Sequence, residues 1–281
     1  MELSDGAVEG IARDFAHAAL GDPRRTRRAQ VSVAQLAKKP SASLPEAMGS
    51  AAALEGMYRF VNNRRVTFDG LLHGHCEATA SRATKGGAVV VVHDTTDATF
   101  PELDAKEIGY LPTGKPGFLV HLSLVLDASS WRRPLGVIHA ETIHRSQRSK
   151  RGARKSSGRE TVGQADSEGA RWWRGIEAAA GPLQSCSEVV HVADRESDSY
   201  ELMHKCFEGG HRFVFRTRVT TRRTRIAGGH DAAWSTVAGI AQSAEGVLER
   251  EVMLSARKTK SAPGMNRGNP PRNKRTATLR F

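Results

Sequence analysis

A run of β-branched residues at 88–93, Ala-Val-Val-Val-Val-His, constrains the fold of this chain more than any other feature. Apolar side chains at successive positions indicate a strand buried on both faces, which is typical of a parallel α/β sheet. A second run at 188–193, Glu-Val-Val-His-Val-Ala, has the same character. Each run is followed at once by an aspartate, Asp94 in the first case and Asp194 in the second. The sequence therefore predicts an α/β fold with acidic residues at the ends of central strands.

Further strands and helices complete a mixed α/β domain, which we expect to span residues 85–220. The patterns predict additional strands at 119–126, 135–142 and 211–218, and helices at 171–180 and 198–207. Residues 144–160 are polar, strongly basic and poor in apolar side chains, so we expect a loop or a disordered insertion there. The order of elements argues against a repeat array.

Residues 1–84 are expected to form a small helical domain. Asp22 is a good N-cap and Pro23 suits a first helical turn, so a helix is predicted to begin there. Further helices are predicted at 44–60 and 68–83. The glycines that follow Lys85 mark the junction with the sheet.

Residues 221–281 differ in composition, and we expect them to begin a β-rich insertion. Residues 257–275 contain three prolines and many Lys and Arg, which indicates an exposed basic loop, and 276–281 read as the start of a returning strand. The sequence stops inside this strand, so we expect a truncated chain.

The charge of the chain favours a polyanionic partner. Lys and Arg number 42 against 30 Asp and Glu, a formal net charge of +12. Lys and Arg that neutralise phosphates release condensed counterions, which drives binding to nucleic acid. Arg24, Arg25, Arg27 and Arg28 fall in the first turns of a predicted helix, where the helix macrodipole disfavours cations. DNA phosphate would offset that cost; the alternative is an ordinary solvated basic face.

The cysteines and the apolar segments bear on location. Three widely spaced cysteines without a Cys-x-x-Cys pair argue against a zinc site and favour a reduced cytoplasmic protein. The N-terminus has acidic residues where a signal peptide is basic. No stretch approaches the run of about 20 apolar residues that spans a bilayer. We therefore expect a soluble, cytoplasmic protein.

Asp94 and Asp194 are the candidate metal ligands. If their strands are neighbours, the two carboxylates can share divalent cations, and Mg²⁺ prefers such oxygen ligands. Two metal ions about 3.5–4 Å apart can activate a water and stabilise the leaving oxygen of a phosphodiester. For either aspartate alone, a helix N-cap or a turn after a strand is the commoner role.

Short segments in a fixed order resemble one protein family. They are ALGDPRRTRR, VAQLAKKP, EGMYRFVNN, VVHDTTDATF, GFLVHLSLVLDA, PLGVIHAETIHR, RWWRGI, VVHVADRESDSYELM and HRFVFRTR. In this order and spacing they resemble the cut-and-paste bacterial transposases of the Tn-five and insertion-sequence-four type, members of the RNase H-like DDE superfamily. The resemblance covers nearly the whole chain.

The resemblance implies a helical DNA-binding domain followed by an RNase H-like core, in a bacterial, nucleoid-associated protein. Asp94 and Asp194 would be the catalytic residues and the ligands of Mg²⁺, with Mn²⁺ as an alternative. The implied reaction is cleavage at transposon ends by water and joining of the 3′-hydroxyl to target DNA, by a protein that forms a homodimer at full length. The basic residues at family-matched positions, where DNA contacts are expected, are Arg24, Arg25, Arg27, Arg28, Arg59 and Arg216.

One part of the family pattern is missing. The third acidic ligand is a Glu in a Tyr-x2-Arg-x3-Glu-x6-Lys signature, and the sequence contains no such pattern. Glu249 and Glu251 are weak substitutes, because both fall in a predicted insertion strand. Three functions stay open: a DNA transposase, a catalytically inactive remnant or regulator that binds DNA, and a basic RNA-binding protein. The last leaves the two aspartates unexplained.

Overall fold

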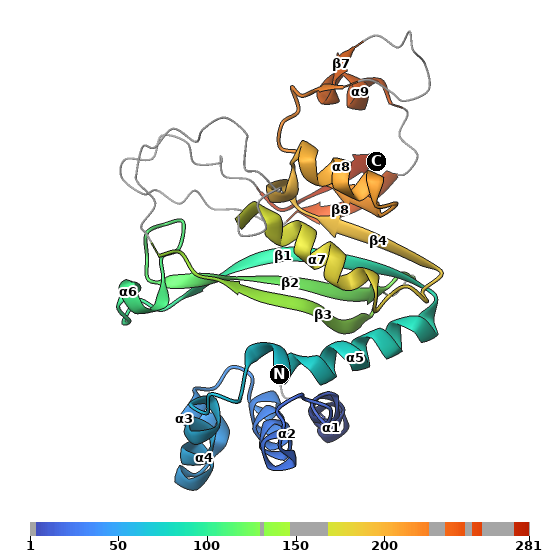
Figure 1. Ribbon diagram of the computed structural model, residues 1–281. Coiled ribbons are helices and arrows are strands. Elements are labelled where there is room, and N and C mark those ends of the chain that lie inside the picture. Colours follow the sequence, from blue (N-terminus) through green and yellow to red (C-terminus); the bar gives the residue numbers. More distant parts are fainter. Residues whose placement is uncertain are drawn as a thin grey trace. The chain divides into compact units, whose positions relative to one another are not determined.

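The computed structural model describes residues 4–129, 132–146, 168–224, 234–244, 249–254 and 273–280. These residues belong to two compact units, Met1–Arg218 and Val219–Phe281. The first unit contains the N-terminal helices and a five-stranded sheet (Figure 1). The expected loop at 144–160 and the basic segment at 257–275 lie largely outside the described residues.

The first unit begins with five helices. They are α1 (Asp5–Asp14), α2 (Pro23–Lys38), α3 (Leu44–Met48), α4 (Ala51–Val61) and α5 (Phe68–Gly86). The start of α2 is as predicted, since the Asp22 side chain accepts a hydrogen bond from the Arg24 amide at 2.8 Å and Pro23 is the first helical residue. Residues from three segments form a small core, made of Ala18, Leu20, Ala29 and Phe60.

The prediction of one helix over 44–60 was wrong. Gly49 ends α3 in a left-handed conformation with φ of 70°, and Ser50 then caps α4 by accepting from the Ala53 amide. Glycine adopts positive φ at little cost, and a serine with extended backbone is a good N-cap, so the Gly-Ser pair divides the segment into two helices.

The sheet has the order β3-β2-β1-β4-β5. Its strands are β1 (Ala88–Thr99), β2 (Gly117–Asp127), β3 (Pro134–Ile143), β4 (Glu188–Ala193) and β5 (Arg212–Phe215). β2 runs antiparallel to both β1 and β3, whereas β1, β4 and β5 run parallel to one another. The predicted mixed α/β fold is confirmed, and the arrangement is consistent with an RNase H-like fold.

Short and long helices connect the strands. They are α6 (Ala105–Ile108), the 3-10 turn η1 (Glu168–Ala170), α7 (Arg171–Ala180), the 3-10 turn η2 (Arg195–Ser197) and α8 (Tyr200–Glu208). The strand expected over 211–218 is shorter, because β5 ends at Phe215. The predicted limits of α7 and β4 are confirmed.

The two faces of the sheet differ. On one face, Val89, Val91 and Val125 pack in a core with side chains of α5 and α7. On the other face, Val90 and Val192 line an open apolar cavity of about 470 Å³. Strand alternation places Asp94 on this second face, in line with Val90 and Val92.

The second unit is built from short elements. β6 (Arg223–Thr224) pairs with β7 (Ser235–Thr236), which leads into α9 (Val237–Ser243). β8 (Glu249–Leu254) pairs antiparallel with β9 (Arg275–Arg280), where a returning strand was expected. Both Glu249 and Glu251 therefore lie in a strand of this unit.

Candidate functional site

The strands that carry the two candidate ligands are adjacent and parallel. His93 of β1 pairs with Ala193 of β4, and Ala193 pairs with Phe215 of β5. Three chemically notable residues each come one position after this row of paired residues, namely Asp94, Asp194 and Arg216. Because neighbouring strands lie about 4.8 Å apart, the three backbone positions lie side by side where the pairing of β1, β4 and β5 ends.

The prediction that Asp94 lies at the end of its strand was wrong, because Asp94 lies inside β1. β1 continues to Thr99 because it stays paired with β2, although its pairing with β4 stops at His93. Asp94 is exposed, and its Oδ1 accepts a hydrogen bond from the Thr95 amide at 2.8 Å. The carboxylate is therefore held on a paired, extended backbone and faces solvent.

Asp194 is exposed and caps a turn. It is the N-cap of η2, and its Oδ1 accepts from the Glu196 amide at 2.8 Å. The capping role that is common for an isolated aspartate is thus present here, beside the neighbouring carboxylate of Asp94. The capping bond fixes the Asp194 side chain relative to the turn that follows β4.

Carboxylate oxygens are ligands that a hard divalent cation prefers, and Asp94 and Asp194 are exposed and follow paired residues of β1 and β4. Among the described residues, no group of three or more His, Cys, Asp or Glu side chains is arranged to hold a metal ion. Asp94 and Asp194 are thus two exposed carboxylates at matched backbone positions.

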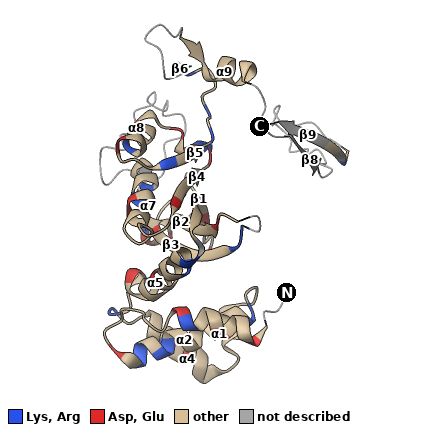
Figure 2. Cartoon of the chain, turned by 90° about the vertical axis from the view of Figure 1, so that its right-hand side faces the viewer, with Lys and Arg blue, Asp and Glu red and all other residues tan. Residues whose placement is uncertain are grey.

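The predicted DNA-contacting arginines of α2 differ in their surroundings. Arg24 and Arg27 are exposed on the helix, along which Figure 2 shows a series of Lys and Arg. Arg25 is more buried, with its guanidinium donating to the Leu20 carbonyl and lying 3.9 Å from an Asp22 oxygen. Arg28 is exposed and lies against α4, where a Cβ added to Gly56 would meet its Cζ at 3.1 Å. Exposure therefore favours Arg24, Arg27 and Arg28 over Arg25 as contacts, and Arg28 alone of these three lies against α4.

The other two predicted contacts lie elsewhere. Arg59 is on α4, is 77% exposed, and forms an ion pair with Glu55 one helical turn earlier. Arg216 is exposed and its backbone amide donates to the Ala193 carbonyl at 3.1 Å, which fixes it beside the strand that leads to Asp194. Arg216 is thus an exposed basic residue at the carboxylate edge.

A row of buried histidines behind this edge was not recognised in the sequence. His93, His121 and His191 come from three neighbouring strands and are at most 1% exposed. His93 Nδ1 lies 2.9 Å from Ser123 Oγ, and its Nε2 lies 2.9 Å from His191 Nδ1. The available signal was a histidine directly after two apolar residues in each strand motif, VVHD, LVHL and VVHV.

The histidine row is kept uncharged by its surroundings. Burial, with smaller contributions from neighbouring charges, lowers the pKa of His93 to about 2, of His121 to about 3 and of His191 to about 4. Gly175 of α7 allows the helix to approach, because a Cβ there would meet Ser123 Oγ at 2.7 Å and His93 Nδ1 at 3.0 Å. The row is therefore a tightly packed polar layer between the sheet and α7.

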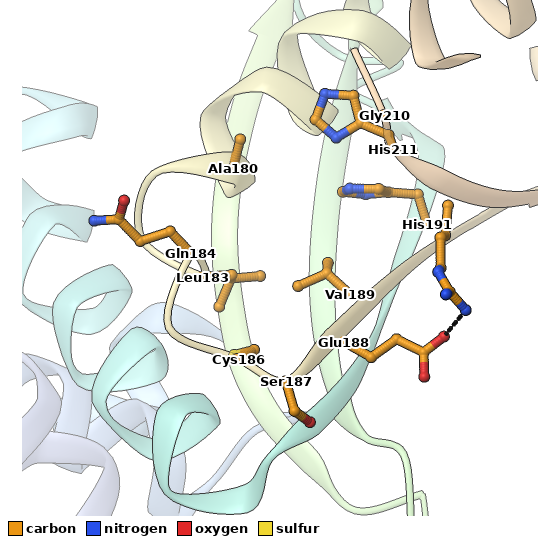
Figure 3. Close-up of a pocket in the computed structure, with 11 residues that line it drawn as sticks. Ala180, Leu183, Gln184, Cys186, Ser187, Glu188, Val189, His191, Gly210 and His211 are labelled. Carbon is orange, nitrogen blue, oxygen red and sulfur yellow. Dashed lines mark hydrogen bonds and ion pairs between the residues drawn. The ribbon is translucent and has the colours of Figure 1, made fainter. Parts of the chain in front are cut away.

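A cavity of about 370 Å³ lies at the opposite edge of the sheet from the two aspartates (Figure 3). Residues at the starts of β4 and β5 line it, and Glu188 and Arg212 at its rim form an ion pair with a distance of 2.6 Å between Oε1 and Nη1. The parallel strands run away from this cavity toward Asp94 and Asp194, so it is separate from the candidate metal site.

No helix in the described part of the chain combines the length and apolarity needed to cross a bilayer. The comparison with protein families concerns the N-terminal helices. Residues 9–66, which contain α2, α3 and α4, match the family model described as transposase DNA-binding. This similarity supports a transposase-type DNA-binding function for the chain, with DNA as its partner.

Proposed function

We propose that this chain is a DNA transposase of the RNase H-like DDE type, which cuts and joins DNA at transposon ends. The observation that carries the proposal is the paired row of β1, β4 and β5, after which Asp94, Asp194 and Arg216 follow at matched positions. The match of residues 9–66 to the family model of transposase DNA-binding domains supports DNA as the substrate.

The roles follow from the position and chemistry of each group. Asp94 and Asp194 would hold Mg²⁺, or Mn²⁺ in its place, through hard carboxylate oxygens. When bound there, the cation supplies an acidified water and stabilises negative charge on a phosphodiester. Arg216, exposed at the same edge, attracts the DNA backbone, and the helices of residues 9–66 bind the end sequence, in a protein that acts as a homodimer.

A second candidate function keeps DNA binding and omits catalysis. It is motivated by the sequence, which contains two aspartates of the family pattern but no Tyr-x2-Arg-x3-Glu-x6-Lys signature. Two carboxylates would hold the metal ions less completely than three, so the ions would stabilise less of the negative charge that develops in phosphoryl transfer. Such a protein would be a remnant or a regulator that occupies transposon ends.

A nicking assay separates these two functions. A catalytically active chain should nick duplex DNA carrying its own transposon ends in Mg²⁺, and Asp94→Ala and Asp194→Ala should then reduce the rate by about 100-fold or more. Asp97→Ala is the matched control, because Asp97 is an exposed aspartate on the same strand. Nicking by the parent chain that does not exceed that of Asp94→Ala would favour the inactive binding protein.

DNA binding by α2 is tested through its salt dependence. We expect the double variant Arg24→Ala/Arg27→Ala to reduce the slope of log K against log salt by about 2, since each phosphate contact contributes about 0.9. The matched control removes the exposed lysines Lys85 and Lys106, outside residues 9–66, and should leave the slope nearly unchanged. Equal slopes for the two double variants would mean that the phosphate contacts are not made by Arg24 and Arg27. In a separate comparison, tighter binding to structured RNA than to duplex DNA would contradict the proposed DNA-binding function.

A further inference from the structure

Arg171, the first residue of α7, is a charged residue in the interior. It is only 8% exposed, although an arginine is almost always found at the surface unless its charge is paired. Its guanidinium carbon lies 5.0 Å from the centre of the Trp172 ring, which is itself part of the core between α7, β4 and α8. A buried guanidinium must be held by specific partners, because removing it from water is costly.

Those partners lie on the two segments that bear the candidate ligands. Arg171 Nε donates to Thr95 Oγ1 at 2.9 Å, and Nη2 donates to Glu196 Oε2 at 3.1 Å. Thr95 immediately follows Asp94 on β1, and Glu196 lies two residues after Asp194 in η2. A single side chain therefore links the two segments across the edge of the sheet.

The same two partners also orient the carboxylates. The Thr95 amide donates to Asp94 Oδ1 at 2.8 Å, and the Glu196 amide donates to Asp194 Oδ1 at 2.8 Å. Arg171 thus binds the side chains of Thr95 and Glu196. The backbone amides of these same two residues bind the aspartates. On one side the partner follows its aspartate by one residue and on the other by two.

We propose that Arg171 is a positioning residue that sets the separation and orientation of Asp94 and Asp194 for a divalent cation. This inference rests on the proposed function, because it needs the two aspartates to be the ligands. The planar guanidinium suits the task, since its donors diverge at fixed angles and a lysine ammonium lacks that geometry. Its burial and its bonds to Thr95 and Glu196 distinguish it from an arginine that contacts DNA.

The next arginine of α7 provides a matched control. Arg174 lies one turn further along the helix and is paired in the same manner, with its Nε 2.9 Å and its Nη2 2.8 Å from Glu141 Oε2 on β3. Arg174→Met removes the same charge and the same kind of ion pair from the same helix, but leaves the contacts of Thr95 and Glu196 unchanged.

The test measures Mn²⁺ binding by the full chain in the absence of DNA, with electron paramagnetic resonance as the detection method. We expect Arg171→Met to weaken Mn²⁺ binding by about 10- to 100-fold, as is usual when a residue that orients metal ligands is lost. Arg174→Met should change it by less than about 3-fold. The sign is diagnostic, because removing a positive charge near a cation site strengthens cation binding if charge alone acts.

A charge-neutral variant guards against a folding defect. Thr95→Val removes the Oγ1 that accepts from Arg171 and that also lies 2.9 Å from His121 Nδ1, without changing the net charge. We expect it to weaken Mn²⁺ binding by several-fold with a normal circular dichroism spectrum. Duplex DNA affinity of both variants should match that of the parent, because residues 9–66 are untouched.

The outcomes distinguish this inference from the proposed function. Mn²⁺ binding by folded Arg171→Met and Thr95→Val that equals or exceeds the parent's overturns the positioning role alone. Parent binding that Asp94→Asn and Asp194→Asn leave unchanged overturns the metal site itself, and the positioning role with it.

Discussion

Lowering the pH from 7 to 5 is expected to reduce the free energy of unfolding by about 5 kcal/mol, through the three buried histidines alone. A domain at the lower end of ordinary stability, which is about 5–15 kcal/mol, would then be close to unfolding. The cause is burial, which lowers the pKa of His93 to about 2, of His121 to about 3 and of His191 to about 4 from the ordinary value of 6.5.

The direction of the effect follows from which state binds more protons. Between pH 6.5 and about 4 the unfolded chain protonates these histidines and the folded chain does not, so stability is complete above about pH 6.5 and falls as the pH falls. Each histidine contributes about 1.4 kcal/mol per pH unit in this window. The contribution of His191 stops growing near pH 4, where its folded pKa lies.

The hydrogen bond between two of these histidines is a second reason why they stay neutral in the folded state. His93 Nε2 and His191 Nδ1 face each other at 2.9 Å, so one ring donates and the other accepts. If both rings were charged, two N–H donors would point at each other in a buried site. The desolvation cost of charge and the lost acceptor therefore act in the same direction.

Urea unfolding at a series of pH values measures this effect. His121→Asn removes one of the three groups, and the dependence on pH below 6 should become shallower by about 1.4 kcal/mol per unit. His204→Gln, an exposed histidine on α8, is the control and should keep the slope of the parent. A parent chain that is equally stable at pH 5 and pH 7 would show that the histidines are protonated when folded.

Local patterns in the sequence predicted most of the strands and helices. The valine runs predicted two strands buried on both faces; they form the parallel pair β1 and β4, but only one face of these strands lies in the core, and Val90 and Val192 on the other face line an open cavity. Asp22 and Pro23 predicted the start of α2, because an N-cap and a first-turn proline act within one helical turn. Such signals depend on a few neighbouring residues, so they can be read without the fold.

What the sequence could not give depends on pairing between distant segments. β1 extends past Asp94 to Thr99 because β2 lies beside it, and no feature of residues 95–99 alone requires a strand. The proposed role of Arg171 depends on its bonds to Thr95 and Glu196, which are 76 and 25 residues away from it in the sequence. The histidine layer likewise needs three strands and Gly175 in place before its members meet.

Replacing Asp14 by Ala is expected to lower the free energy of unfolding by about 3 kcal/mol. Asp14 ends α1 and is 14% exposed, and it accepts two hydrogen bonds from Arg82 of α5, at 2.7 and 2.8 Å. It also lies 3.0 Å from His75 Nδ1. The estimate is below that for a fully buried ion pair because the Arg82 side chain is 38% exposed.

This cluster joins the N-terminal helices to the edge of the sheet. Arg82 Nε donates to the Leu135 carbonyl of β3 at 2.7 Å, and the Val137 amide of the same strand donates to His75 Nε2 at 3.0 Å. These partners assign the His75 proton to Nδ1, where it faces the Asp14 carboxylate. Loss of Asp14 therefore leaves the His75 Nδ1–H and the Arg82 guanidinium without the carboxylate that accepts from them.

The control for this prediction is on the same helix. Asp5→Ala breaks an ion pair with Lys38 that is 3.8 Å long and well exposed, and should cost about 0.5 kcal/mol. A double-mutant cycle of Asp14→Ala with Arg82→Ala, measured by urea unfolding, should give a coupling of about 1–3 kcal/mol. A coupling near zero would mean that Arg82 holds β3 through Leu135 independently of α1, and the N-terminal helices would then be joined to the sheet by apolar packing rather than by this cluster.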